Sequence, residues 1–117
     1  QAPLRLDRYS EPEPDLAVLR PSANHYKSAH PGPADALLVI EVAETSLRYD
    51  RDVKVALYAR FGIVEVWLID TRNARLTRYR NPVAGTYESV DEPDVIQPLG
   101  IGALPAVSLD LRSLFTT

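Results

Sequence analysis

A glutamate inside an apolar run constrains the fold more than any other feature of the sequence. Residues 37–43 read LLVIEVA, so that six apolar residues surround Glu41. An apolar run of this length predicts a strand that is buried on both faces of a sheet. An ionised carboxylate that is buried without partners costs on the order of several kcal/mol. We therefore expect Glu41 to be neutral, to pair with a cationic side chain, or to hold a metal cation.

The length and composition of the chain are those of one globular domain. It has 117 residues, of which 45% are hydrophobic and 25% charged, and folding units commonly have about 100–150 residues. The longest apolar stretch, residues 36–43, is too short to cross a membrane, and no secretory signal is recognisable. We expect a single domain over residues 1–117 and no membrane partner.

Two residue types are absent from the chain. The absence of cysteine excludes disulfides and thiolate metal sites, and it fits a cytoplasmic protein. The absence of methionine, in a chain that begins with Gln1, leads us to expect further sequence upstream. The net charge of −3 argues mildly against a non-specific nucleic-acid coat, but it is compatible with a nuclease that has a local basic rim.

The hydrophobic pattern predicts a mixed α/β domain built on one sheet. Strands are expected at residues 16–19, 37–43 and 64–69. A helix is expected between the last two, from about residue 47 to Gly62, which favours a helix end. Because one helix cannot cover both faces of the strand at residues 37–43, we expect an upstream segment or a second subunit to cover the other face.

The predicted helix has two adjacent apolar stripes, and the chain after it reads as a meander. The stripes consist of Val53, Ala56, Leu57 and Arg60, and of Lys54, Leu57, Tyr58 and Phe61. After the helix and the third strand we expect a turn at 70–73, a hairpin from 75–80 and 86–90 with 81–85 as its loop, a strand at 106–111 and a helical turn at 112–115.

Three residues with reactive or metal-binding side chains lie on the first two strands and the helix. Asp15 follows Pro14 at the start of the first strand, Glu41 lies inside the second, and Lys54 lies in the helix. If these two strands are neighbours, their acids converge at one edge of the sheet. Mg²⁺ is held by one or two carboxylates together with water and substrate phosphate, and a nearby lysine can orient the attacking water or offset the phosphate charge. This set of side chains therefore fits metal-dependent phosphodiester hydrolysis.

Each of these residues also has a structural interpretation. Asp15 can form a turn or a cap. Lys54 can form a surface ion pair with Asp50, four residues earlier, which would be worth about 0.2–0.5 kcal/mol. Glu41 can form a buried ion pair with an arginine.

Other candidate residues carry a weaker signal. His25 and His30 lie in a proline-rich loop and lack the spacing of a helical metal site. Ser46 lacks the context of a nucleophile elbow, and the sequence has no glycine-rich phosphate loop. Glu65 either shares the sheet face of Glu41 or has a structural hydrogen-bonding role. Four arginines either line a phosphate path or form a solvated face: Arg72, Arg75, Arg78 and Arg80.

Three segments carry a resemblance to a known family. They are PEPDLAVLRP at 12–21, PADALLVIEVAETSLRYDRDVKVALYARFGIVEVWLID at 33–70 and LPAVSLDLRSLF at 104–115. Together they closely resemble the Uma family of restriction-endonuclease-like proteins, over residues from about 10 to 115. The residues in register in the central block are Glu41, Asp50, Lys54, Tyr58, Glu65, Trp67 and Asp70.

The resemblance implies the PD-(D/E)XK nuclease fold, in which helices flank a mixed central sheet. The usual catalytic set of that fold is an aspartate after proline, an acid on the next strand, and a lysine two residues beyond that acid. Asp15 and Glu41 match the first two elements, whereas Ala43 stands where the lysine is usual. The lysine can move to the following helix in families of this fold, and Lys54 stands there. Because the family's early helix and strands have no counterpart here, we expect an amino-terminally truncated domain.

Three interpretations follow. In the first, the protein is a Mg²⁺-dependent endodeoxyribonuclease, also able to use Mn²⁺, with Asp15 and Glu41 as metal ligands and Lys54 positioning water. DNA is then the substrate, and a homodimer would allow both strands to be cut. In the second, the nuclease fold is kept as a non-catalytic binding or assembly module, which the acidic pI and the missing strand lysine favour. In the third, the acids of a small α/β domain are structural.

Overall fold

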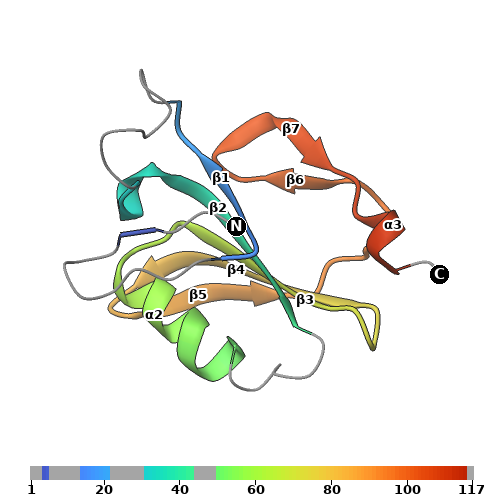
Figure 1. Cartoon of the computed structure of the whole chain (residues 1–117), viewed down its shortest axis with the longest axis horizontal. Coiled ribbons are helices and arrows are strands. Elements are labelled where there is room, and N and C mark those ends of the chain that lie inside the picture. The colour runs from blue at the N-terminus through green and yellow to red at the C-terminus, as the bar shows by residue number, and fades with distance from the viewer. Residues whose placement is uncertain (1–3, 6–13, 22–30, 44–49, 116–117) are drawn as a thin grey trace.

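A five-stranded mixed sheet forms the centre of the computed structural model, which describes residues 4–5, 14–21, 31–43 and 50–115 (Figure 1). Its strands follow the order β1-β2-β3-β4-β5, and a separate two-stranded sheet pairs β6 with β7. The strands are β1 (Leu16–Leu19), β2 (Ala36–Ala43), β3 (Glu65–Asp70), β4 (Arg75–Val83), β5 (Thr86–Asp91), β6 (Leu99–Ile101) and β7 (Leu104–Leu109). The helical elements are the 3-10 turn η1 (Pro33–Asp35), the π-helical turn η2 (Asp50–Lys54), α2 (Val55–Arg60) and α3 (Arg112–Phe115).

Strand directions explain where the helix lies. β1 runs antiparallel to β2, whereas β2 and β3 are parallel, and β3, β4 and β5 form an antiparallel meander. Parallel neighbours need a crossover connection, and the segment between β2 and β3 contains α2. The predicted mixed α/β fold is confirmed. None of the helices in the described ranges is long and apolar enough to cross a membrane.

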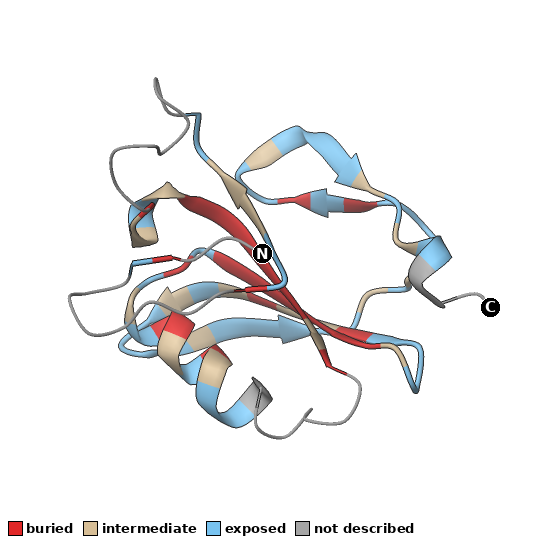
Figure 2. Ribbon diagram, viewed as in Figure 1, coloured by how far each residue is buried: buried red, intermediate tan, exposed pale blue. Residues whose placement is uncertain are grey.

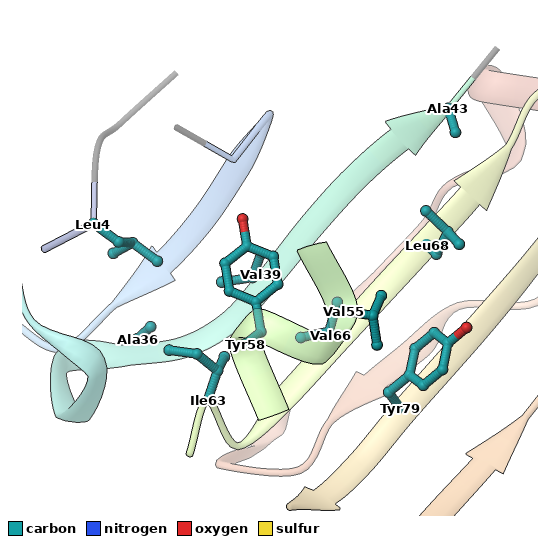
Figure 3. Packing of buried hydrophobic residues seen from close by; sticks show 10 residues of the cluster. All are labelled: Leu4, Ala36, Val39, Ala43, Val55, Tyr58, Ile63, Val66, Leu68 and Tyr79. Carbon is teal, nitrogen blue, oxygen red and sulfur yellow. The ribbon is translucent and has the colours of Figure 1, made fainter. Parts of the chain in front are cut away.

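Strands β2 and β3 are buried along nearly their whole length, as the apolar run predicts (Figure 2). Alternate side chains point to opposite faces, so that each strand contributes to two clusters. One cluster lies between the sheet and α2 (Figure 3). Its members are Leu4, Ala36, Val39, Ala43, Val55, Tyr58, Ile63, Val66, Leu68 and Tyr79.

The β6–β7 hairpin covers the other face of the sheet. Leu99 and Ile101 of β6 pack against a cluster from the main sheet that consists of Leu38, Ile40, Trp67, Ile69 and Leu76. The expectation that an upstream segment or a second subunit supplies this cover was wrong. The sequence LGI of β6 is too short to be recognised as a strand, and its role depends on contacts with residues as distant in the sequence as Leu38 and Leu76.

The buried face of the helix matches neither candidate stripe, and Tyr58 of the second stripe is the one stripe member that is buried. Val55, Tyr58 and Ala59 are buried, whereas Ala56 is exposed and Val53 is 46% exposed. The stripe that began with Val53 therefore faces solvent. The candidate stripes assume regular α-helical spacing, whereas residues Asp50–Lys54 form the π-helical turn η2.

Gly62 ends the helix, as predicted. Its backbone has a φ of +77°, the left-handed conformation that favours glycine. The amide of Gly62 donates to the carbonyl of Ala59 and the amide of Ile63 to that of Tyr58, at 3.1 and 3.0 Å. This is a Schellman motif, and its apolar contact is between Ile63 and Tyr58, which share the cluster under α2. The end of the helix thus fixes the backbone of Tyr58, whose ring packs in that cluster.

The β4–β5 hairpin is tighter than predicted. The strands continue through Asn81 and Pro82 to Val83, and a two-residue turn at Ala84 and Gly85 joins them. Both turn residues have positive φ, 52° and 83°, which matches the twist of a two-residue hairpin. Pro82 is tolerated because pairing of β4 with β3 ends at Arg80. The predicted turn after β3 is confirmed, since the Asp70 carboxylate accepts from the Asn73 amide at 3.2 Å.

We predict that Gly62→Ala lowers the free energy of unfolding by roughly 1–2 kcal/mol, the cost of a left-handed backbone for a residue with a Cβ. Gly100→Ala is the matched control, because an added Cβ finds open space at both positions and only Gly62 has a positive φ. Urea denaturation of both variants measures the difference. Equal stabilities of the two variants would contradict the prediction.

Candidate functional site

Pairing of β1 with β2 brings Asp15 close to Glu41. Leu16 lies opposite Ile40 in the antiparallel register, so that the residue before Leu16 comes beside the residue after Ile40. The Asp15 Oδ2 atom accepts a hydrogen bond from the backbone amide of Val42 at 2.7 Å. Its partner lies 27 residues away in the sequence, so this bond is not a local turn or helix cap. The expected convergence of the two acids at this part of the sheet is observed, with Asp15 exposed and Glu41 buried.

Glu41 is 1% exposed, and both of its carboxylate oxygens have partners from the helix side. The Tyr58 hydroxyl donates to Oε1 at 2.7 Å, and the Lys54 ammonium lies 3.2 Å from Oε2. Glu41 shares a sheet face with Val39 and Ala43, which pack under α2. Of the possibilities raised by the apolar run, pairing with a cation is the one observed, and the cation is a lysine instead of an arginine.

Burial raises the pKa of the Glu41 carboxyl above its ordinary value of 4.5. The Tyr58 hydrogen bond and the charge and hydrogen bond of Lys54 oppose this rise, because they stabilise the ionised form. The negative charge of Asp15 adds to the rise in pKa. Glu41 therefore interacts with all three of its polar neighbours, and these interactions couple the four side chains electrostatically.

Lys54 reaches Glu41 from the turn that leads into α2. It is the last residue of η2, and its side chain is 30% exposed. Ala43 lies on the same face of β2 but is 1% exposed and packed in the cluster. A helical lysine therefore reaches the face on which a strand lysine at position 43 would lie. The alternative ion pair with Asp50 falls outside the described side chains.

The donor set is compatible with a hard divalent cation. Mg²⁺ and Mn²⁺ prefer oxygen ligands, and Mg²⁺ usually takes one or two carboxylates with several waters. Asp15 and Glu41 supply two carboxylates, and the Lys54 ammonium already places a positive charge at Oε2 of Glu41. A metal ligand role for Oε2 requires the cation to share this oxygen with Lys54 or to replace the lysine there. Within the described ranges, no group of three or more acidic, histidine or cysteine side chains is placed to hold a metal.

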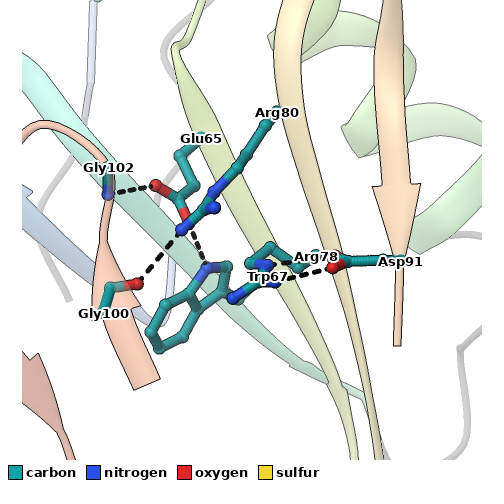
Figure 4. A network of polar contacts seen from close by, with 7 residues as sticks. All are labelled: Glu65, Trp67, Arg78, Arg80, Asp91, Gly100 and Gly102. Atoms are coloured by element: carbon teal, nitrogen blue, oxygen red, sulfur yellow. Dashed lines mark hydrogen bonds and ion pairs between the residues drawn. The ribbon is translucent and has the colours of Figure 1, made fainter. Parts of the chain in front are cut away.

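The second buried glutamate, Glu65, has a structural role on the opposite face of the sheet. Its Oε2 atom accepts from Trp67 Nε1 at 2.7 Å and from Arg80 Nε at 2.8 Å, and Oε1 accepts from the Gly102 amide at 2.9 Å (Figure 4). Arg80 also donates to the carbonyl of Gly100 at 3.2 Å. The hydrogen-bonding interpretation is confirmed, whereas the expectation that Glu65 shares the face of Glu41 was wrong. Glu65 therefore links the β6–β7 hairpin to the main sheet through the Gly102 amide.

Three of the four candidate arginines have acidic partners. Arg78 forms a bidentate pair with Asp91 at 2.6 and 3.0 Å, and the other two pairs are Arg75 with Glu92 and Arg80 with Glu65. These pairs neutralise most of the charge that a phosphate path would need. Arg72 is exposed in the turn after β3. His25, His30 and Ser46 lie outside the described residues.

Sequence reasoning missed Tyr58 as a member of this site. The signal was present, because Lys54 and Tyr58 are four residues apart in the same helical stripe and therefore lie on one face. A tyrosine in an apolar stripe is ordinarily assigned to the core. Its ring does lie in the core, while its hydroxyl reaches the buried carboxylate.

We predict a pH-dependent stability difference between the wild type and Glu41→Gln in metal-free buffer. Because the folded-state pKa of Glu41 is raised above 4.5, this carboxyl contributes stability that is fully present below the unfolded-state pKa and is lost as the pH rises through the folded-state pKa. The free energy of unfolding of the wild type minus that of the variant should therefore fall above pH 4.5 and then level off. Chemical denaturation across this range measures it, and a difference that rises with pH would contradict the prediction.

Comparison with known proteins identifies the family of the chain. No curated protein matches the chain significantly. The model of the Uma2 family, described as "Putative restriction endonuclease", matches residues 1–111. That match covers Asp15 just before β1, Glu41 in β2 and Lys54 at the end of η2. The chain therefore belongs to the Uma2 family of restriction-endonuclease-like proteins.

Proposed function

We propose that this protein is a divalent-metal-dependent endonuclease that hydrolyses phosphodiester bonds of DNA. The observation that carries the proposal is the convergence of Asp15, Glu41 and Lys54, which come from three separate elements. Membership in a family described as a restriction endonuclease supports a nuclease function and DNA as the substrate. The residue types match those that metal-dependent phosphodiester hydrolysis requires.

Asp15 and Glu41 would hold Mg²⁺ or Mn²⁺, and they differ in environment. Asp15 is exposed, and its carboxylate is fixed by the Val42 amide, so it can face solvent and substrate. Glu41 is buried, and the Tyr58 hydroxyl of the helix holds its carboxylate in one orientation. A bound divalent cation supplies Lewis-acid chemistry, by lowering the pKa of a bound water and offsetting charge on the phosphate.

Lys54 would act on the water and the phosphate. Hydrolysis forms a bond from the water oxygen to phosphorus, breaks the bond from phosphorus to a sugar oxygen, and moves a proton from the water to the leaving oxygen. The Lys54 side chain is partly exposed, and its ammonium donates a hydrogen bond to Oε2 of Glu41. It can orient the attacking water and stabilise the additional negative charge that develops on the phosphate.

One observation favours a non-catalytic role. Both oxygens of Glu41 already have protein partners, and every fully buried side-chain polar atom in the described part of the chain has a hydrogen-bond partner. Such a closed network would also suit a binding or assembly module that keeps the nuclease fold. Metal binding separates the two functions, because only the nuclease needs a cation at these carboxylates.

We predict that wild-type protein binds Mg²⁺ and Mn²⁺, and that Glu41→Gln and Asp15→Asn abolish binding, because each removes a charged ligand. Isothermal titration calorimetry measures the binding. Glu88→Gln is the matched control, since it makes the same change on the edge strand β5, three strands from β2. Absence of binding to the wild type would overturn the nuclease proposal in favour of the binding module.

We predict that Lys54→Met reduces metal-dependent cleavage of plasmid DNA by roughly 10²–10³-fold, the usual cost of losing one electrostatic contact to the transition state. Mn²⁺ binding should persist, since both carboxylates remain. Gel assays of cleavage and calorimetry of Mn²⁺ binding measure the two effects on the same preparation. Cleavage at the wild-type rate would mean that Lys54 is only a structural partner of Glu41.

A further inference from the structure

Tyr58 contacts the candidate site through its hydroxyl, while its ring belongs to the core. The ring is fully buried, and it packs with Val39 and Ile63 in the cluster under α2 (Figure 3). The Schellman motif at the end of α2 fixes the backbone of Tyr58, because its carbonyl accepts from the Ile63 amide. The hydroxyl is therefore presented from a side chain whose position is set by packing.

The two oxygens of Glu41 have different environments because of this contact. The Tyr58 hydroxyl donates to Oε1 at 2.7 Å, a buried hydrogen bond to an acceptor that carries charge when ionised. The other oxygen, Oε2, faces Lys54, whose side chain is partly exposed. Oε1 is thus held inside the core by Tyr58, whereas Oε2 lies beside the Lys54 ammonium.

We infer that Tyr58 is a positioning residue, which holds Glu41 in the orientation that presents Oε2 to a divalent cation. This inference rests on the proposed function, since it concerns the same metal. Partners that orient a metal ligand through its other polar atom typically change metal affinity or activity by about 10–100-fold when they are removed. The site then consists of the two carboxylates, the lysine and Tyr58, whose ring lies in the core under α2.

The test compares two tyrosine-to-phenylalanine variants that each lose one hydroxyl. Tyr58→Phe removes the bond to Glu41. Tyr87→Phe is the matched control, because it removes a hydroxyl bond in the same cluster, from Tyr87 to the Ile63 carbonyl at 2.6 Å, and leaves the bond from Tyr58 to Glu41 in place. Calorimetry with Mn²⁺ gives the affinity, and plasmid cleavage at increasing Mg²⁺ gives the concentration for half-maximal rate and the maximal rate.

We expect Tyr58→Phe to weaken Mn²⁺ binding by about 10-fold or more and to raise the half-maximal Mg²⁺ concentration, with the maximal rate recovered at saturating metal. Tyr87→Phe should bind Mn²⁺ like the wild type. Equal affinities of both variants and the wild type would overturn the inference while the proposed function stands. A wild type that binds no metal would overturn the proposed function, and the inference with it.

A measurement on the wild type covers the case in which Tyr58→Phe does not fold. A buried hydroxyl that donates to a carboxylate gives a slowly exchanging proton resonance in nuclear magnetic resonance spectra. We expect the Tyr58 hydroxyl resonance to persist when Mg²⁺ is added, because Oε1 keeps its donor while Oε2 binds the cation. Loss of this resonance on Mg²⁺ binding would overturn the inference.

Discussion

Burial of the Glu41 carboxylate under α2 is the constraint on which the rest of the site depends. A charge taken out of water must be matched by donors and cations, and breaking a buried pair by removing one partner costs roughly 3–5 kcal/mol. Lys54 and Tyr58 both meet this requirement from the helix side. Their shared target ties the register of η2 and α2 to β2, so that the position of the helix and the geometry of the site have one physical cause.

Two glutamates, Glu41 and Glu65, are buried in the sheet, and their polar partners differ. Glu65 is enclosed by Trp67, Arg80 and the Gly102 amide, and these bonds attach the β6–β7 hairpin to the sheet. Glu41 instead has an exposed acid, Asp15, beside it and a partly exposed cation at one oxygen. A buried glutamate therefore attaches a hairpin on one face of the sheet, as Glu65, and is a candidate metal ligand on the other face, as Glu41.

The position of the lysine follows from the same packing. Ala43 is in the core because α2 covers that part of β2, and a long side chain there would have to displace the cluster. A lysine that approaches from η2 reaches the carboxylate with a partly exposed side chain and leaves the core intact. Lys54 and Tyr58 are four residues apart, a helical spacing that places both on one face, and they reach the two oxygens of one carboxylate.

The sequence by itself determined the main elements of the fold. Strong local signals were sufficient for β1, β2, β3 and the helix end at Gly62, because apolar runs and a left-handed glycine act within a few residues. The pair of acids followed from Pro14–Asp15 and Glu41 once their strands were taken as neighbours. Tertiary structure alone decided that Glu65 faces away from Glu41, that β6 covers the second face, and that Tyr58 holds the carboxylate. These features depend on sheet register and on contacts between distant residues, which local patterns do not encode.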